Sequence, residues 1–423
     1  VLTHCGRWCS VELISGLRSR PNLTTLREKS PVGNRHRFLV VPVSLLYSSG
    51  VSVRGKAPRP NSHDARTPGP IIFMLDKRQI EELVAEHGDQ VSVGRSIREL
   101  IADGELPRLK GATVLEGKVS DSVIGEDLVT RGGHQLRLMF RNNRISTHDI
   151  NRGAIPFKDQ VLAFNHAHML QLVRPILGTS QFEIPGLKPS STVIPAENLK
   201  LIMFENVLRL YNAESSTSTS LYKHWLAARK EGLEVVTYAG HDLNVADLEV
   251  NRRLPYLIDT PSTKDREDRT VDVGALVDNG VCTEQEYAQI RNASIMAFGV
   301  VSEYLRGRNM VLVDTKTEHG VNSAGQIVVA DEVYTMDSSR FWRLDENNTL
   351  MTRDGKPVSF SKEFARGMVT EKNQQFSPEQ TRAIATRYIL GLQHLLGGEF
   401  TPDLRERDER IVDSTNLILD SLL

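Results

Sequence analysis

The chain has 423 residues, with 52 lysines and arginines against 53 aspartates and glutamates, and hydrophobic residues make up 39% of it. A chain of this length is too long for one small core, so we expect two or three folding units of an ordinary soluble globular protein. The near-neutral charge predicts no nucleic-acid partner, because it gives no general attraction to phosphate backbones. No apolar run approaches the about 20 residues that span a bilayer, so we expect no membrane partner.

The cysteine content favours a reducing compartment. Cys5, Cys9 and Cys282 are too few and too widely spaced for a disulfide framework or a four-thiolate zinc site. We therefore expect a cytoplasmic protein.

Residues 1–73 differ in composition from the rest, with eleven lysines and arginines, three acids, many serines and prolines and no sustained periodicity. We interpret them as a disordered or non-native extension, because apart from the run FLVVPVSLLY they have little apolar area to bury. Such a stretch fits sequence read through ahead of a true start at Met74. It equally fits a transit peptide, which would make the location organellar. Both interpretations stay open.

Regular structure is expected just after Met74. The stretch DKRQIEELVAEHG predicts a helix with Asp76 as N-cap, Gln79 as capping-box partner and Gly88 as terminator. Short strand-like pieces then follow over residues 111–150 and predict an antiparallel meander.

Further strands and helices alternate in the second half. SSTVIPAENLKLIMFENVLRLY continues the strands, and SSTSTS interrupts the chain ahead of a helix-like LYKHWLAARKEG. A capping box of Thr283 and Glu286, with apolar residues at steps of three and four, predicts a helix that ends at Gly307. Another helix is predicted from Ser377, with Pro378 at its first position.

Between these two helices, LVDTKTEHG runs from an apolar strand into charge. Because side chains alternate along a strand, Asp314, Lys316 and Glu318 should share one face. VNSAGQIVVADEVY predicts a return strand after a turn at 322–325, and closing the hairpin around that turn places Asp331 opposite Lys316 and diagonal to Glu318.

Two carboxylates at this distance repel each other unless a cation lies between them. Glu318 and Asp331 therefore predict a magnesium ion carrying phosphate, with Lys316 meeting a phosphate or carboxylate. The alternative is an exposed hairpin with cross-strand salt bridges, each worth about 0 to 1 kcal/mol. The hairpin alone leaves both interpretations open.

The segments GKVSDS, DTPSTK, LVDTKTEHG and DEVYTMDSSRFW resemble, in order and position, the SAICAR synthetase (phosphoribosylaminoimidazole-succinocarboxamide synthase) family over about residues 111–400. The last two are the most specific, since they are similar to the family's DTKFEFG and DEVLTPDSSRFW. The resemblance implies an α+β fold with a strand-rich N-terminal lobe, a mixed C-terminal lobe and ATP in the cleft. We place these lobes at residues 74–205 and 206–423.

The resemblance also implies a reaction. ATP and Mg²⁺ would be used to join L-aspartate to the carboxylate of carboxyaminoimidazole ribonucleotide (CAIR), giving SAICAR, ADP and phosphate in purine biosynthesis through an acyl phosphate. CAIR and L-aspartate are then the expected partners, while the oligomeric state stays open.

Metal and catalytic roles carry over to four residues. Glu318 and Asp331 match the family's magnesium-holding acids, Lys316 would steady the transferring phosphoryl group, and Asp314 would orient this set. Phosphoryl transfer depends mainly on such placed charges.

Nucleotide contacts are implied for four more. Gly117 and Lys118 of GKVSDS match a hairpin that covers the phosphates, Glu205 would lie near the adenosine, and Lys264 matches the lysine of the family's DTPSTK-like element.

The resemblance implies substrate contacts for residues in four segments: FENVLR, the stretch SSTSTS, DSSRFW and NRISTHD. They are Arg209, Ser215, Ser339, Arg340, Ser146 and Asp149. Two arginines beside serines suit a phosphate monoester. For Arg340 the alternative is a local pair with Asp337.

Some positions differ from the family pattern, and because of these differences two other functions remain possible. Asn143, Ser120 and Glu214 replace common residues, and STSTS adds residues near Ser215. A kinase-like phosphotransferase for a small metabolite, or a catalytically silent ATP-binding protein, are the alternatives. His166 and His168 are two residues apart and would diverge on a helix, which argues against a metal site there.

Overall fold

Two short upstream strands, β1 (Leu23–Arg27) and β2 (Phe38–Pro42), pair antiparallel. Beyond them, the computed structural model describes residues 74–117, 119–147, 150–264, 269–369 and 374–423. The other predictions for residues 1–73 lie outside the described residues. The chain divides into two compact units, Val1–Gly69 and Pro70–Leu423. The lobe boundary after residue 205 stays a prediction.

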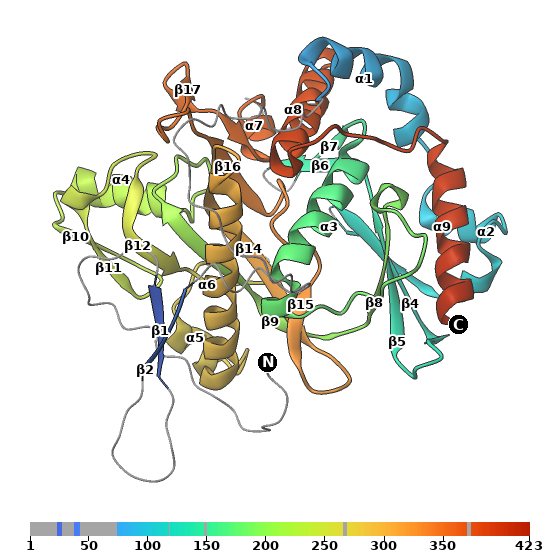
Figure 1. Cartoon of the computed structure of the whole chain (residues 1–423), viewed down its shortest axis with the longest axis horizontal. Helices are drawn as coiled ribbons and strands as arrows, with labels where there is room; N and C mark the ends of the chain where they lie inside the picture. Colours follow the sequence, from blue (N-terminus) through green and yellow to red (C-terminus); the bar gives the residue numbers. More distant parts are fainter. Residues whose placement is uncertain are drawn as a thin grey trace, which may run out of the picture. The chain divides into compact units, whose positions relative to one another are not determined.

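Two larger sheets and several helices make up residues 70–423 in an α+β arrangement (Figure 1). The first sheet has the antiparallel order β3-β4-β5-β8. Its strands are β3 (Thr113–Leu115), β4 (Ser120–Val129), β5 (Gln135–Arg141) and β8 (Val193–Glu197). The meander predicted over 111–150 is confirmed, since β3, β4 and β5 are neighbours in both the chain and the sheet.

The second sheet has the order β12-β9-β14-β16-β19, with β13 paired to β9 and β15 paired to β14. Its strands are β9 (Lys200–Tyr211), β12 (Arg253–Asp259), β13 (Ser262–Thr263), β14 (Met310–Val321), β15 (Ile327–Ala330), β16 (Ser339–Arg343) and β19 (Ser359–Phe360). The hairpin predicted from VNSAGQIVVADEVY is confirmed as β14–β15. β14 is central and carries the charged stretch.

Three small hairpins lie beside these sheets. They are β6 (Arg144–Thr147) with β7 (Ile150–Ala154), β10 (Val235–Tyr238) with β11 (His241–Asn244), and β17 (Thr352–Arg353) with β18 (Lys356–Pro357). The first of them carries the NRISTHD element.

The helices begin at side-chain caps where the sequence indicated them. The described helices are α1 (Lys77–Ser92), α2 (Ile97–Ala102), α3 (Lys158–Leu177), α4 (Leu221–Glu231), α5 (Val273–Asp278), α6 (Glu284–Arg306), α7 (Glu363–Arg366), α8 (Pro378–Leu396) and α9 (Arg407–Leu422). Both predicted capping boxes, at Asp76 and at Thr283, are present. Pro378 opens α8 as expected. Within the described residues, no helix has the length and apolar character that crossing a bilayer requires.

Gly88 does not end α1, so that prediction is wrong. The helix continues to Ser92, and Gly88 is buried within it. A Cβ placed on Gly88 would lie 3.2 Å from the Cβ of Pro156. The glycine therefore allows close packing against a residue far along the chain.

The two largest apolar clusters of this unit join its helices to its two sheets. The larger one joins α3, α6 and α8 to β14 through residues such as Met169, Phe298 and Leu312. A second cluster fills the space between the first sheet, α2 and the C-terminal helix α9, with Leu138 and Ile411 among its members. The last helix of the chain thus covers a sheet formed by its first half (Figure 1).

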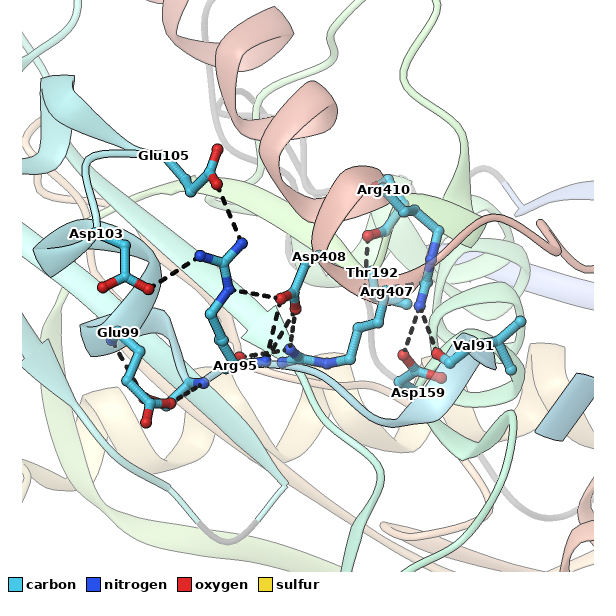
Figure 2. Close-up of polar contacts among 12 residues, drawn as sticks. Val91, Arg95, Glu99, Asp103, Glu105, Asp159, Thr192, Arg407, Asp408 and Arg410 are labelled. Atoms are coloured by element: carbon cyan, nitrogen blue, oxygen red, sulfur yellow. Dashed lines mark hydrogen bonds and ion pairs between the residues drawn. The ribbon is translucent and has the colours of Figure 1, made fainter. Parts of the chain in front are cut away.

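A buried ion pair fixes α9 in this position (Figure 2). The guanidinium of Arg410 lies 3.1 Å from the carboxylate of Asp159 at the start of α3, and neither side chain is exposed. Arg410 also donates to the backbone oxygens of Val91, at 3.1 Å, and Ser190, at 2.6 Å. One side chain therefore joins three separate segments to the C-terminal helix.

Replacing Arg410 by methionine should lower the free energy of unfolding by about 3 to 5 kcal/mol, because Asp159 is left as an uncompensated buried charge. Arg405→Met is the control, since Arg405 pairs with Asp403 at an exposed site and should cost about 0 to 1 kcal/mol. Urea unfolding measures both variants. Equal losses would contradict a special role for the buried pair.

Candidate active site

A cavity of about 680 Å³ lies at the charged end of β14. Strands β4 and β5 of the first sheet and β9 and β14 of the second line it, together with residues 215–220 and 361–366. Most of the lining residues carry a charge or a hydroxyl group. Such a lining suits a phosphorylated or carboxylated ligand.

Eleven of the predicted site residues line this one cavity. They are Gly117, Glu205, Arg209, Ser215, Lys264, Asp314, Lys316, Glu318, Asp331, Ser339 and Arg340. Ser146 is buried on β6 and is not among the lining residues. Lys118 and Asp149 lie outside the described residues.

Strand alternation explains why three charges of β14 meet here. Asp314, Lys316 and Glu318 all line the cavity, as predicted. Thr317 between them is buried, and its Oγ1 lies 3.5 Å from Nδ2 of Asn206 on β9. The buried threonine anchors the strand while its neighbours face the ligand space.

The register of the β14–β15 hairpin differs from the prediction by one residue. Glu318 lies opposite Ala330, so the predicted pairing of Asp331 with Lys316 is wrong. The amide of Asn322 donates to the oxygen of Gln326 at 3.0 Å, which makes the turn one residue longer than expected. Both predicted metal acids, Glu318 and Asp331, nevertheless line the cavity.

The backbone of Asp331 is left-handed, with φ of 53°. Aspartate is one of the few residues that adopt this region readily, and such residues cluster at functional sites. In the described part of the chain, its carboxylate has no hydrogen-bond or ion-pair partner. It is therefore available to a ligand.

Two lysines of the cavity are paired with carboxylates. Nζ of Lys316 lies 2.5 Å from Oε1 of Glu205 on β9, and Nζ of Lys264 contacts Glu318. Burial alone would lower the pKa of Lys316, but the carboxylates of Glu205 and Glu318 outweigh it and raise that pKa above its usual value. Lys316 is thus a permanent ammonium near neutral pH and can bind anions but not accept a proton.

Asp314 lies between two arginines from neighbouring strands. It is directly opposite Arg209 of β9 and Arg340 of β16 in the sheet register. Its Oδ2 is 3.4 Å from Arg209 Nη1 and 2.8 Å from Arg340 Nη2. Burial would lower the pKa of Arg340, but Asp314 raises it, so the Arg340 guanidinium stays charged beside the cavity.

The alternative local pair of Arg340 with Asp337 does not form. Asp337 instead lies 2.8 Å from Nζ of buried Lys158 and accepts a 2.5 Å hydrogen bond from Tyr388. Burial alone would raise the pKa of Asp337, but Lys158 lowers it. The side chain of Arg340 is thereby left to Asp314 and to the backbone oxygen of Glu214, at 3.1 Å.

Hydroxyl groups lie beside the arginine pair. Oγ of Ser339 is 2.8 Å from Oγ1 of Thr315, and Oγ of Ser215 accepts a 3.2 Å hydrogen bond from the amide of Thr217. Thr217, Thr219 and Ser220 also line the cavity. The serine- and threonine-rich insertion therefore enlarges the polar wall next to Arg340.

Several charged residues of this cavity were not predicted from the sequence, and Glu332, Lys362 and Arg366 are three of them. Glu332 is buried, with Oε2 at 3.2 Å from Arg141 of β5, and burial raises its pKa. Lys362 and Arg366 come from the segment around α7. Two signals in the sequence could have indicated these residues. Glu332 directly follows the predicted metal ligand Asp331, and Lys362 and Arg366 are four residues apart, which places them on one side of a helix. Neither signal is specific to a binding site.

The donor set fits a magnesium ion that also carries phosphate oxygens. Among the described residues, no group of three or more histidine, cysteine, aspartate and glutamate side chains could hold a metal by itself. Mg²⁺ usually keeps waters and binds through one or two carboxylates plus substrate phosphates. Glu318 and the unpaired carboxylate of Asp331 supply that number.

The two histidines of FNHAHML do diverge, as predicted. Nδ1 of buried His166 accepts a hydrogen bond from the amide of Val333 at 3.1 Å, while the ring of His168 packs against Tyr304. Burial lowers the pKa of His166 to about 3, so it remains a neutral acceptor.

The family of the chain follows from its similarity to known proteins. The sequence profile of the SAICAR synthetase family matches residues 117–383, more than half of the chain. The chain therefore belongs to the SAICAR synthetase family.

Individual relatives span most of the chain. The phosphoribosylaminoimidazole-succinocarboxamide synthase, chloroplastic, of Arabidopsis thaliana is 28% identical over 88% of this chain and 87% of its own length. The enzyme of the same name from Cytophaga hutchinsonii is 29% identical over 73% of this chain and 95% of its own. A SAICAR synthase structure from Saccharomyces cerevisiae, complexed with SAICAR, has the same fold, with a TM-score of 0.57 and 20% identity over 73% of this chain and 99% of that one.

Lys362 should react with amine reagents at a lower pH than ordinary lysines. Burial lowers its pKa to about 8, so half of its side chains are neutral and nucleophilic near that pH. Trace acetylation read by mass spectrometry should therefore give a rate for Lys362 with a midpoint near pH 8. Because this pKa lies below the unfolded value, the cost of the buried charge is present below pH 8 and is relieved as the pH rises above it.

Exposed Lys356 of the same segment is the internal control. A midpoint for Lys362 above about pH 10, where a free lysine titrates, would contradict the assigned environment.

Proposed function

We infer that the chain is an ATP-dependent ligase that joins L-aspartate to the carboxylate of CAIR and releases SAICAR, ADP and phosphate, a step of purine biosynthesis. The observation that carries this inference is that eleven residues matched to the family's motifs line a single cavity. All of them lie within residues 117–383, the part that matches the family profile. The names of relatives that span most of the chain support the same activity.

Glu318 and Asp331 would hold magnesium on the ATP phosphates. The metal would neutralise phosphate charge as it develops. Lys316 adds a fixed positive charge from the same strand, which its pairing with Glu205 keeps in place. Gly117 and Lys264, which also line the cavity, would contact the nucleotide, and Lys264 is held there by its contact with Glu318.

Arg209 and Arg340, with Ser215 and Ser339, would bind the phosphate of CAIR. Asp314 would act by holding the two guanidinium groups, since its carboxylate contacts both. An arginine held in this way loses less rotational freedom when it binds a ligand.

An amide forms from a carboxylate only after the carboxylate oxygen becomes a better leaving group. Transfer of the γ-phosphoryl group of ATP to the carboxylate of CAIR would give an acyl phosphate and ADP. The amine of L-aspartate would then attack the acyl carbon, and phosphate would leave with the C–O electron pair. Lys316 lies where it can stabilise the negative charge of both steps.

The location is a separate proposal. The word chloroplastic in the name of the Arabidopsis relative supports an organellar location with a transit peptide in residues 1–73. A cytoplasmic location is the other prediction from the sequence, and no observation favours a kinase-like or silent protein over the ligase.

Purified protein should release ADP only when CAIR, L-aspartate, ATP and Mg²⁺ are all supplied. A coupled ADP assay with each component left out in turn measures this. ADP release without CAIR would instead indicate a phosphotransferase, and no release by folded protein under any condition would refute the ligase.

Glu318→Gln and Asp331→Asn should each lower turnover by about 10²-fold or more, because each removes a charge that stabilises the transferring phosphoryl group. Asp354→Asn is a matched control, because Asp354 is an exposed aspartate with a similar left-handed φ of 52°. Steady-state kinetics at saturating ATP, with thermal unfolding as a check of folding, measures all three. If the two cavity variants behave like the control, the acids do not hold the metal.

A further inference from the structure

Arg144 on β6 reaches across to the turn between β3 and β4. Its Nη2 donates a 2.7 Å hydrogen bond to the backbone oxygen of Gly117 and also contacts the carboxylate of Asp121. The arginine side chain is one-third exposed, whereas Asp121 is buried. A charged donor thus holds the backbone at Gly117, which lines the cavity.

This turn is tight and depends on outside support. A Cβ placed on Gly117 would lie 2.3 Å from the backbone oxygen of Ser120, so only glycine fits. The amide of Gly117 donates to Oδ1 of Asp121 at 3.2 Å, and the oxygen of Val119 accepts from the amide of Asn142 at 3.0 Å. Asp121 therefore receives hydrogen bonds from the turn and from Arg144 at the same oxygen.

The other end of this link lies in the hairpin of β6 and β7. The amide of Arg144 donates to Oδ1 of Asn142 at 3.0 Å, and Arg144 lies opposite Ala154 of β7. Ser146, two residues further along β6, is one of the residues predicted to contact CAIR. Arg144 thus connects the turn at Gly117, which lines the cavity, to the hairpin of β6 and β7.

We propose that Arg144 is a positioning residue for nucleotide binding, which acts by holding the Gly117 turn through Asp121 and the oxygen of Gly117. This rests on the proposed function insofar as the turn faces ATP. Without the guanidinium, the buried carboxylate of Asp121 loses a charged partner and the turn loses the hydrogen bond to the oxygen of Gly117. Part of the nucleotide's binding free energy would then be used to order the turn.

Arg98 of α2 offers a matched control that contacts the chain just ahead of the turn. It donates to Glu116, at 2.8 Å, and to the oxygen of Val114, at 2.6 Å, and it is more than half exposed. Like Arg144, it is not among the cavity-lining residues. Both arginines therefore support the chain ahead of the turn, but only Arg144 contacts Gly117 itself.

The test is calorimetric binding of ATP with Mg²⁺ to the full chain, without CAIR or L-aspartate. Arg144→Met should weaken binding by about tenfold, which corresponds to about 1.4 kcal/mol. Arg144→Lys should recover part of the loss, because an ammonium can still donate to Asp121. Arg98→Met should leave the affinity unchanged. Asp121→Asn keeps an acceptor for the Gly117 amide but removes the negative charge that holds Arg144, so it should also weaken binding.

Equal weakening by Arg144→Met and Arg98→Met would overturn the proposal, because it would mean that general packing of the hairpin is what matters. Unchanged affinity in both Arg144 variants, or in Asp121→Asn, would also overturn it. Where turnover is measured, Arg144→Met should raise the KM for ATP by about tenfold and change kcat by less than about threefold. A tenfold fall in kcat with an unchanged KM for ATP would contradict the proposal that Arg144 positions the nucleotide site.

The binding arm separates this inference from the proposed function. Wild-type protein that binds ATP but forms no SAICAR would refute the ligase. The ATP affinities of the Arg144 and Arg98 variants would still test the role of Arg144. Wild-type protein that binds no ATP would overturn both.

Discussion

The carboxylate of Asp314 is the interaction on which the arrangement of the candidate site depends. It lies on the central strand β14, directly opposite Arg209 on one side and Arg340 on the other. Two guanidinium groups this close would repel each other without it. The sheet register thus determines where the arginines lie, and the same strand then presents Lys316 and Glu318 at the following positions of that face. The hydrogen-bond register of the second sheet therefore also determines the geometry of the site.

Local signals in the sequence were sufficient for much of this arrangement. Helix starts were predictable because a capping residue and its partner are three residues apart, and the shared face of β14 followed from strand alternation. The sequence could not show that α1 continues past Gly88, because Gly88 packs against Pro156, which is distant in the chain. The hairpin register failed by one residue because the turn closes through Asn322 and Gln326, a detail of loop geometry.

Buried charge pairs were the hardest features to predict. Arg410 with Asp159, Lys158 with Asp337 and Arg141 with Glu332 each join segments more than a hundred residues apart. Sequence patterns carry no information on such partners, which is why Asp337 was first considered as a local partner of Arg340. Buried pairs add little net stability compared with apolar packing, but they tolerate few alternative arrangements. The first two pairs fix α3 against α9 and against the segment of Asp337, and the third joins β5 to Glu332 in the cavity lining.

The position of α9 has a consequence for how the chain acquires its structure during synthesis. The strands of the first sheet are complete once residue 197 has been made, but the apolar side chains that α9 covers, such as Leu138, stay uncovered until the last helix leaves the ribosome. At about 5 to 20 residues per second, the intervening roughly 220 residues take about 10 to 45 s. The N-terminal half therefore completes its core only after α9 has been synthesised, and chaperone protection of that sheet is most needed in this interval.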